Sequence, residues 1–90
     1  MVSKLKDTQG RARIDITLTR CLLAGRVVGD IKPLGNGVSE LRIHTDPGYR
    51  IYYTLKNQQM MLLLIGGSKT SQSKDIEKAY NLARELQESQ

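Results

Sequence analysis

Two stretches with alternating polar and apolar residues carry the side chains best suited to chemistry. Val38–His44 and Tyr49–Lys56 each place every second side chain on one face, which is typical of β-strands. If these strands are antiparallel neighbours, their polar faces lie on the same side of a sheet. That side then carries Glu40, Arg42, His44, Arg50, Tyr52, Thr54 and Lys56.

This polar face has a chemistry that suits phosphate groups. Arginine binds phosphate through paired hydrogen bonds, and tyrosine offers a ring for stacking together with a hydroxyl. His44 is the single histidine of the chain and could assist proton transfer, although a plain surface residue is the simpler interpretation. The structural alternative for the arginines is that Arg42 or Arg50 pairs with Glu40 across the strands.

A second candidate site is Gly66–Ser71, where an apolar strand leads into a helix. Backbone N–H groups at a helix N-terminus, with Lys69 beside them, make an anion site. The segment does not match a nucleotide triphosphate loop, because Leu63 and Ser68 occupy the positions where that motif has glycines. The alternative is ordinary capping of the helix by Thr70 or Ser71.

The charge of the chain is concentrated near its start. Fourteen Lys and Arg against nine Asp and Glu give a net charge of +5, and residues 4–26 hold six basic and two acidic side chains, a local +4. Such an element favours RNA or an acidic protein as partner, and a solvated helix face is the alternative. The basic side chains there are Lys4, Lys6, Arg11, Arg13, Arg20 and Arg26.

Composition excludes several classes of protein. One cysteine, Cys21, leaves no intramolecular disulfide, and one histidine beside it makes a structural zinc site implausible. The longest apolar run, Met60–Ile65, cannot span a bilayer, and no export signal is recognisable at either end. We therefore expect a cytoplasmic protein without membrane, metal or cofactor.

The elements that position these groups form one α+β domain over residues 1–90. The strand Met60–Ile65 is apolar on both faces, which predicts a central position in the sheet. Gly10 interrupts the first helical pattern, so that segment is one helix or a pair. The expected order is a helix over 3–24, a loop over 26–37 that could include a short edge strand near Ile31, a three-stranded antiparallel meander (38–44, 49–56 and 60–65) and a helix over 71–88. The first helix is expected to have one apolar face, formed by Ile14, Leu18, Cys21 and Leu22. The second helix is expected to have an apolar stripe formed by Ile76, Ala79, Tyr80, Ala83 and Leu86.

Several blocks of this sequence resemble the phage-derived addiction-module killer proteins, which are HigB-type toxins of the RelE/ParE superfamily. The blocks are Gly37–Ile43, Pro47–Tyr53 and Leu62–Gln72 followed by Lys74-Asp75-Ile76, with Gly29–Gly35 resembling the lead-in to the sheet. Together they cover nearly the whole chain from about Lys4 onward, so the resemblance predicts a RelE-like fold.

The resemblance implies a toxin that stops growth by cutting messenger RNA, commonly on the ribosome, without a metal or other cofactor. It implies a helix-turn-helix antitoxin as partner, with promoter DNA bound only through the antitoxin complex. Matching positions nominate Arg42 and Arg50 for charge compensation and Lys69, with Tyr52 or His44, for proton transfer. Lys32 is a weaker nomination for RNA binding, and the basic helix would steer the protein toward ribosomal RNA.

One departure from the family concerns the start of the chain. The family usually begins with a strand and half a helix ahead of the stretch resembling Ser3–Asp7. We therefore expect either a start placed too late or a shortened relative, whose exposed sheet edge would favour a homodimer. Two other functions stay open: a ParE-like gyrase inhibitor without nuclease activity, and an inactive truncated relative that only binds antitoxin.

Overall fold

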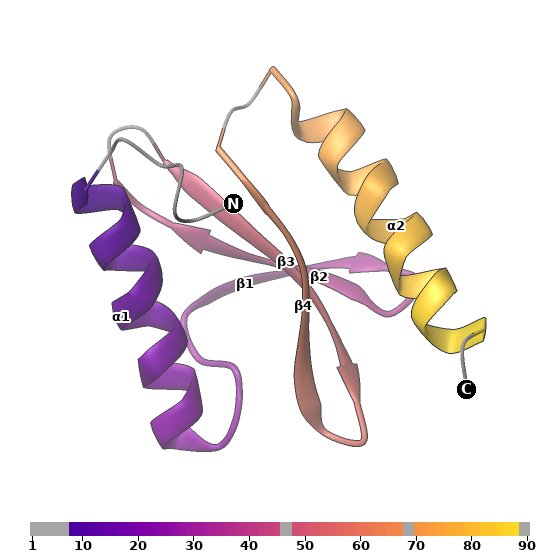
Figure 1. Cartoon of the computed structure of the whole chain (residues 1–90), viewed down its shortest axis with the longest axis horizontal. Helices are drawn as coiled ribbons and strands as arrows, with labels where there is room; N and C mark the ends of the chain where they lie inside the picture. Colours follow the sequence, from indigo (N-terminus) through magenta and orange to yellow (C-terminus); the bar gives the residue numbers. More distant parts are fainter. Residues whose placement is uncertain (1–7, 46–47, 68–69, 89–90) are drawn as a thin grey trace.

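The computed structural model describes residues 8–45, 48–67 and 70–88. Within them, two helices flank a four-stranded sheet, which confirms the predicted α+β class and is compatible with a RelE-like fold (Figure 1). The elements are α1 (Thr8–Ala24), β1 (Asp30–Gly35), β2 (Val38–Ile43), β3 (Tyr49–Lys56), β4 (Gln59–Gly66) and α2 (Gln72–Glu88).

The sheet is an antiparallel meander in the order β1-β2-β3-β4. Its first strand, β1, occupies half of the segment 26–37, which was predicted as a loop with a possible short edge strand, and makes the predicted three-stranded meander four-stranded. Pro33 and the glycines around it hid this strand in the sequence. Pro33 is tolerated because β1 is an edge strand, and a register shift between Pro33 and Gly35 marks an irregularity there.

The last strand, β4, lies at the other edge of the sheet, so the predicted central position is wrong. A register shift opposite Tyr52 and Tyr53 pairs these residues with Leu64 and Leu62, and leaves Leu63 between them as an extra residue. Because of this extra residue, both Leu63 and Leu64 pack toward α2. The strand is therefore rich in apolar residues although it lies at the edge of the sheet.

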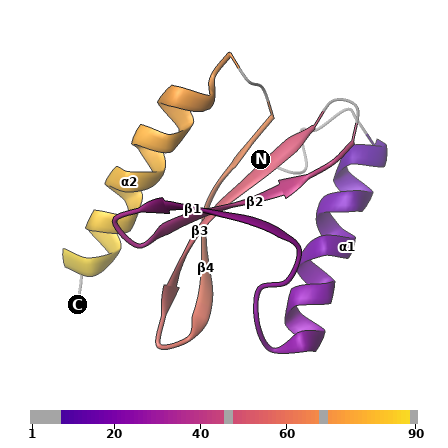
Figure 2. The ribbon, with the colours of Figure 1, turned by 180° about the vertical axis from the view of Figure 1, so that it is seen from behind.

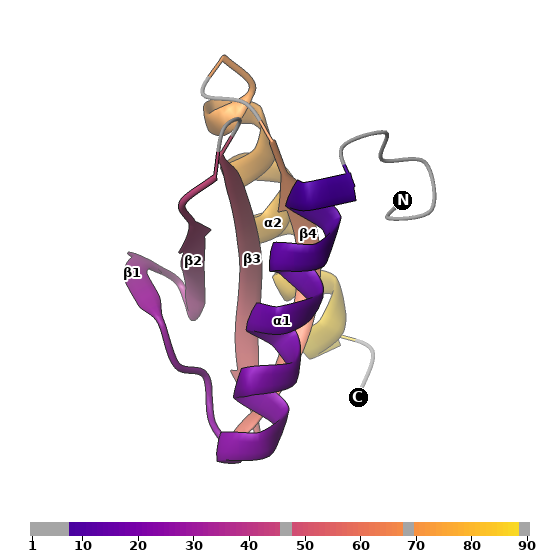
Figure 3. The same cartoon turned by 90° about the vertical axis from the view of Figure 1, so that its left-hand side faces the viewer.

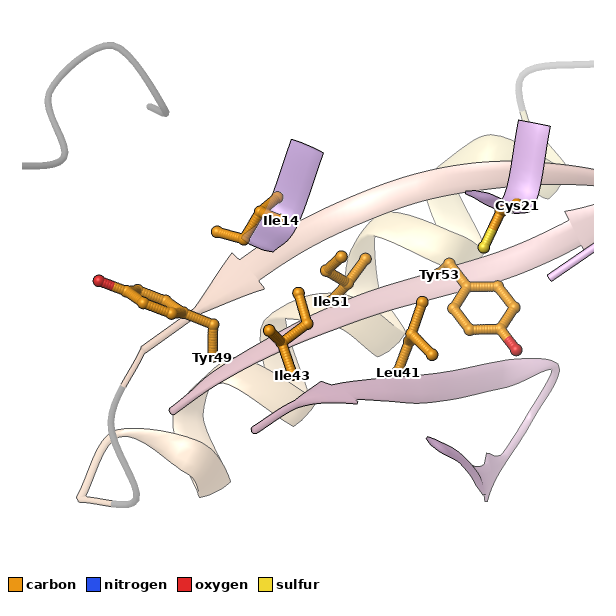
Figure 4. Close-up of a cluster of buried hydrophobic side chains, with 7 residues drawn as sticks. All are labelled: Ile14, Cys21, Leu41, Ile43, Tyr49, Ile51 and Tyr53. Carbon is orange, nitrogen blue, oxygen red and sulfur yellow. The ribbon is translucent and has the colours of Figure 1, made fainter. Parts of the chain in front are cut away.

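The two helices cover opposite faces of the sheet (Figures 2 and 3). Figure 4 shows the core under α1, which consists of Ile14, Cys21, Leu41, Ile43, Tyr49, Ile51 and Tyr53. The cluster under α2 consists of Val38, Tyr52, Ala79 and Ala83, with Leu34, Leu63, Leu64, Ile76 and Tyr80 packed against it. No helix in the described part of the chain is long and apolar enough to cross a membrane.

Helix α1 continues through Gly10, so the described part of the first helical segment is one helix. Its residues 3–7 lie outside the described ranges. The sequence predicts Leu22 on the same buried face as Ile14 and Cys21, but this is wrong, because Leu22 is 81% exposed. It follows Cys21 directly and is therefore rotated by about 100° around the helix. Gly25, with φ of 70°, ends the helix and allows its N–H to bond the carbonyl of Leu22.

Candidate functional site

The strand register places the two candidate arginines directly opposite one another. Arg42 on β2 pairs with Arg50 on β3, while Asp30 on β1 lies on the far side of Arg42 and Gly66 on β4 on the far side of Arg50. We call these four residues the arginine row. Opposed residues in an antiparallel pair have Cβ atoms about 5 Å apart, so the two arginine side chains start from neighbouring points on the same face of the sheet.

Each arginine of the row is paired with a carboxylate. Arg50 Nε lies 2.9 Å from Glu40 Oε1, which is the cross-strand pairing considered as an alternative in the sequence. Arg42 pairs instead with Asp30, where Nη2 donates to Oδ1 at 3.1 Å. A guanidinium group has five N–H donors, so these pairings leave capacity for a phosphate group.

Helix α2 covers half of the polar face that the alternation predicted. Tyr52 and Glu40 are fully buried beneath it, whereas Arg42 is exposed at the side of the sheet. The ring of Tyr52 therefore has no surface on which a base could stack. Thr54 and Lys56 remain half-buried farther along β3, and the Thr54 hydroxyl donates to the carbonyl of Gly37 at 2.7 Å.

The buried part of the face is incompletely hydrogen-bonded. Both oxygens of Glu40, Nε of Arg50 and the hydroxyl of Tyr52 are buried without a hydrogen-bond partner. The short distance between Arg50 and Glu40 is therefore an ion pair whose N–H does not point at the oxygen. Buried polar groups are nearly always satisfied, and such exceptions concentrate at functional sites.

The first turn of α2 closes over the end of β4. The Ser71 hydroxyl donates to Asp75 Oδ2 at 3.0 Å, and the Asp75 N–H donates to the Ser71 carbonyl at 2.9 Å, as expected of a helix that begins after Ser71. A Cβ atom on Gly66 would lie 2.7 Å from Asp75 Oδ2 and 3.2 Å from Tyr52 Cε2. A larger residue at this position would therefore force the Asp75 carboxylate to shift, so the helix start lies close against the end of β4. Lys69 lies outside the described residues.

The exposed end of the row holds the histidine. Nε2 of His44 lies 2.5 Å from Asp30 Oδ2, and the side chain of His44 is 74% exposed. Hydrogen bonds from Arg42 and then from His44 lower the pKa of Asp30, which keeps this carboxyl group ionised. Asp30 is the functional candidate that sequence reasoning missed, because it lay in a predicted loop.

The comparisons with known proteins assign the chain to a family. The profile of the phage-derived protein Gp49-like family (DUF891) matches residues 7–88. The chain belongs to this family. Gp49-like proteins are toxins of toxin–antitoxin systems. An uncharacterized protein of Haemophilus influenzae is 41% identical to the chain over 85 residues, which cover 94% of this chain and 84% of that relative. No solved structure matches the chain.

The described side chains predicted to bind RNA in this Gp49-like protein lie in two places. Arg11, Arg13 and Arg20 are exposed on α1, which packs against the face of the sheet opposite the arginine row. Lys32 is exposed on β1 and lies across from Glu40, on the same face as the row. Lys4 and Lys6 lie outside the described residues. Of the described residues predicted to bind RNA, Lys32 therefore lies on the same face as the site, and the three arginines of α1 lie on the opposite face.

Tyr52 lends itself to a test of the buried cluster. Burial, followed by the charge of Glu40, raises the pKa of Tyr52 to about 12, so its hydroxyl is protonated at neutral pH. Since the protonated form is favoured in the folded state, this group stabilises the protein below pH 10 and loses that contribution as the pH rises toward 12. We expect Tyr52→Phe to keep the free energy of unfolding or raise it by about 1 kcal/mol, because it removes an unsatisfied buried hydroxyl.

Urea unfolding of both proteins at pH 7 and pH 11 measures this effect. The substituted protein should lose less stability between the two pH values than the unsubstituted one. Tyr80→Phe is the matched control, because the Tyr80 hydroxyl donates to the carbonyl of Leu34 at 2.6 Å and its loss should destabilise the protein. A Tyr52→Phe variant that is clearly less stable at pH 7 would show that the hydroxyl has a partner in solution.

Asp30 gives a prediction for acidic pH. Its pKa is lowered from 3.8 in the folded state, so the ionised carboxylate stabilises the protein above that value, and this contribution disappears as the pH falls through the lowered pKa. We expect Asp30→Asn to be less stable than the unsubstituted protein at pH 6, and the difference should shrink as the pH falls through the lowered pKa of Asp30. Thermal unfolding followed by circular dichroism from pH 2 to 7 measures the difference, and a difference that persists unchanged at the acidic end would contradict it.

Proposed function

We propose that this chain is a HigB-type toxin of the RelE/ParE superfamily, and that it inhibits translation by cleaving messenger RNA bound to the ribosome. The observation that carries the proposal is the pairing of Arg42 with Arg50 on adjacent strands. Two guanidinium groups side by side can hold one phosphate and compensate the charge that develops on it. Membership of a toxin family supports the biological setting.

The proposed reaction uses the nucleophile that RNA itself supplies. The 2′-oxygen forms a bond to phosphorus while the bond from phosphorus to the 5′-oxygen breaks, leaving a 2′,3′-cyclic phosphate and a free 5′-hydroxyl. Negative charge grows on the non-bridging oxygens, and preorganised cations near these atoms stabilise the transition state. Arg42 and Arg50 supply that charge, and the chemistry requires no metal ion.

Protons must leave the 2′-hydroxyl and reach the departing 5′-oxygen. Lys69 and His44 are the proposed proton carriers. Tyr52 stays protonated at neutral pH and lies beneath α2, so its proposed part is to support Arg50 from the buried side. The exposed arginines of α1 would steer the protein toward ribosomal RNA by long-range attraction.

The partners follow from the same proposal. A helix-turn-helix antitoxin neutralises the toxin in the cytoplasm, and the complex of the two binds promoter DNA. The sheet edge suited to a homodimer is β4, since its residues from Met60 to Ile65 carry no charge, whereas β1 carries Lys32 and Pro33.

An assay that contains both candidate targets tests the function. The purified protein is added to a reconstituted translation reaction, the mRNA is mapped by primer extension, and supercoiling by gyrase is measured in parallel. We expect cut mRNA and normal gyrase activity. Intact mRNA with altered supercoiling would overturn the proposal in favour of a gyrase inhibitor, and intact mRNA with normal supercoiling would leave only antitoxin binding.

A further inference from the structure

Asp30 contacts two side chains of the proposed site at the same time. One carboxylate oxygen accepts a hydrogen bond from Arg42 at 3.1 Å, and the other lies 2.5 Å from Nε2 of His44. Two neighbouring strands bring these groups together. Asp30 on β1 supplies the carboxylate, Arg42 on β2 supplies the guanidinium, and His44, which directly follows β2, supplies the imidazole.

The contact fixes the protonation of the imidazole ring. An ionised carboxylate can only accept hydrogen bonds, so the nitrogen that faces Asp30 must carry the hydrogen. The neutral ring then has its basic lone pair on Nδ1. Among the described residues, Asp30 from β1 is the charged group paired with the ring, Arg42 from β2 shares the same carboxylate, and the next arginine, Arg50, is paired with Glu40.

Exposure distinguishes this end of the row from the buried end. The side chains of His44 and Arg42 are 74% and 42% exposed, so an RNA chain can reach both. Glu40 and Tyr52 are fully buried and have no such access. Of these four described side chains, the two that RNA can reach lie on the side of Asp30.

We propose that His44 and Asp30 form a catalytic dyad, in which His44 Nδ1 accepts the proton of the attacking 2′-hydroxyl and Asp30 is the positioning residue that orients the ring. This inference deepens the proposed function and rests on it. The 2′-oxygen bonds to phosphorus as its proton moves to Nδ1, and the imidazolium that forms is stabilised by the Asp30 carboxylate. The 5′-oxygen leaves and takes up a proton from water.

The single histidine of the chain makes the dyad directly observable. In a protein labelled with ¹⁵N at histidine, the two ring nitrogens of His44 give one pair of signals, which report the nitrogen that carries the hydrogen. We expect a protonated Nε2 whose proton is shifted downfield and protected from exchange with water. Asp30→Asn should abolish this protected proton, whereas Asp15→Asn, the same change on exposed α1, should preserve it.

Cleavage kinetics test whether the dyad is catalytic. We expect His44→Gln to lower kcat by about 100-fold or more with little change in KM. Asp30→Asn should lower kcat as well, and the double variant should be no slower than His44→Gln alone, because Asp30 acts through the ring. A double variant slowed by the product of the two single effects would assign the effect of Asp30 to Arg42 and overturn the dyad.

The two readouts separate the failure of the dyad from that of the proposed function. If the protein cleaves RNA and His44→Gln cleaves it at the full rate, the dyad is wrong and the proposed function stands. If the protected Nε2 proton is present but no RNA is cleaved under any condition, the proposed function is wrong, and with it the catalytic role of the pair. If the protected proton is absent from the unsubstituted protein, Asp30 does not orient the ring.

Discussion

Replacing Arg50 with lysine is expected to slow the cleavage of mRNA by about 100- to 1000-fold, which is the usual cost of losing one preorganised donor to a transition state. Lysine keeps a positive charge beside Glu40, so the ion pair inside the protein is preserved. It lacks the planar set of donors with which arginine holds a phosphate while also contacting a carboxylate. Single-turnover cleavage on ribosomes measures the effect.

The control for this variant is the same substitution elsewhere. Arg84 is exposed on α2, where its Nη2 donates to Asn81 Oδ1 at 2.6 Å, and Arg84→Lys should cleave at the normal rate. The melting temperature of Arg50→Lys should remain close to that of the unsubstituted protein. A folded Arg50→Lys variant that cleaves at the full rate would remove Arg50 from the proposed site.

Replacing Arg50 with alanine is expected to destabilise the fold by about 3–5 kcal/mol, the range measured when one partner of a buried ion pair is removed. The side chain of Glu40 is only 1% exposed, and that of Arg50 only 14%. Without Arg50, the Glu40 carboxylate is left buried without its ion-pair partner. Urea unfolding at pH 7 measures the loss.

A second substitution tests the cause. Arg50→Ala combined with Glu40→Gln should recover much of the lost stability, because the amide is neutral and needs no counter-charge. Recovery by the double variant would also show that loss of toxicity in Arg50→Ala alone reports unfolding as much as catalysis. An Arg50→Ala protein as stable as the unsubstituted one would mean that water reaches Glu40 in solution.

The sequence predicted most of the sheet and the residues of its polar face. Alternation with a period of two put Arg42, Arg50 and Tyr52 on one side, and the register confirms that they share it. Alternation could not show that α2 covers half of this side. A glutamate and a tyrosine at every second position look solvent-facing, and only the packing of α2 against Val38 and Tyr52 buries them.

The exposed end of the site was less predictable for a different reason. The contact of Asp30 with Arg42 depends on β1, which Pro33 and its neighbouring glycines disguised as a loop. The alternation of Asp30, Lys32 and Leu34 on one face was the signal available, although three residues are too few to distinguish a strand from a turn. Pairing across strands depends on register, and register is set by the whole sheet.

The position of α2 after all four strands has a consequence for the order of folding. Chains fold from the N-terminus as they emerge from the ribosome, and α2 is the last described element to emerge. Glu40 and Tyr52 are buried, and the Gly66–Asp75 contact forms, only when this helix docks. The buried cluster of Glu40 and Tyr52 is therefore completed after the exposed contact of Asp30 with Arg42, which needs only β1 and β2.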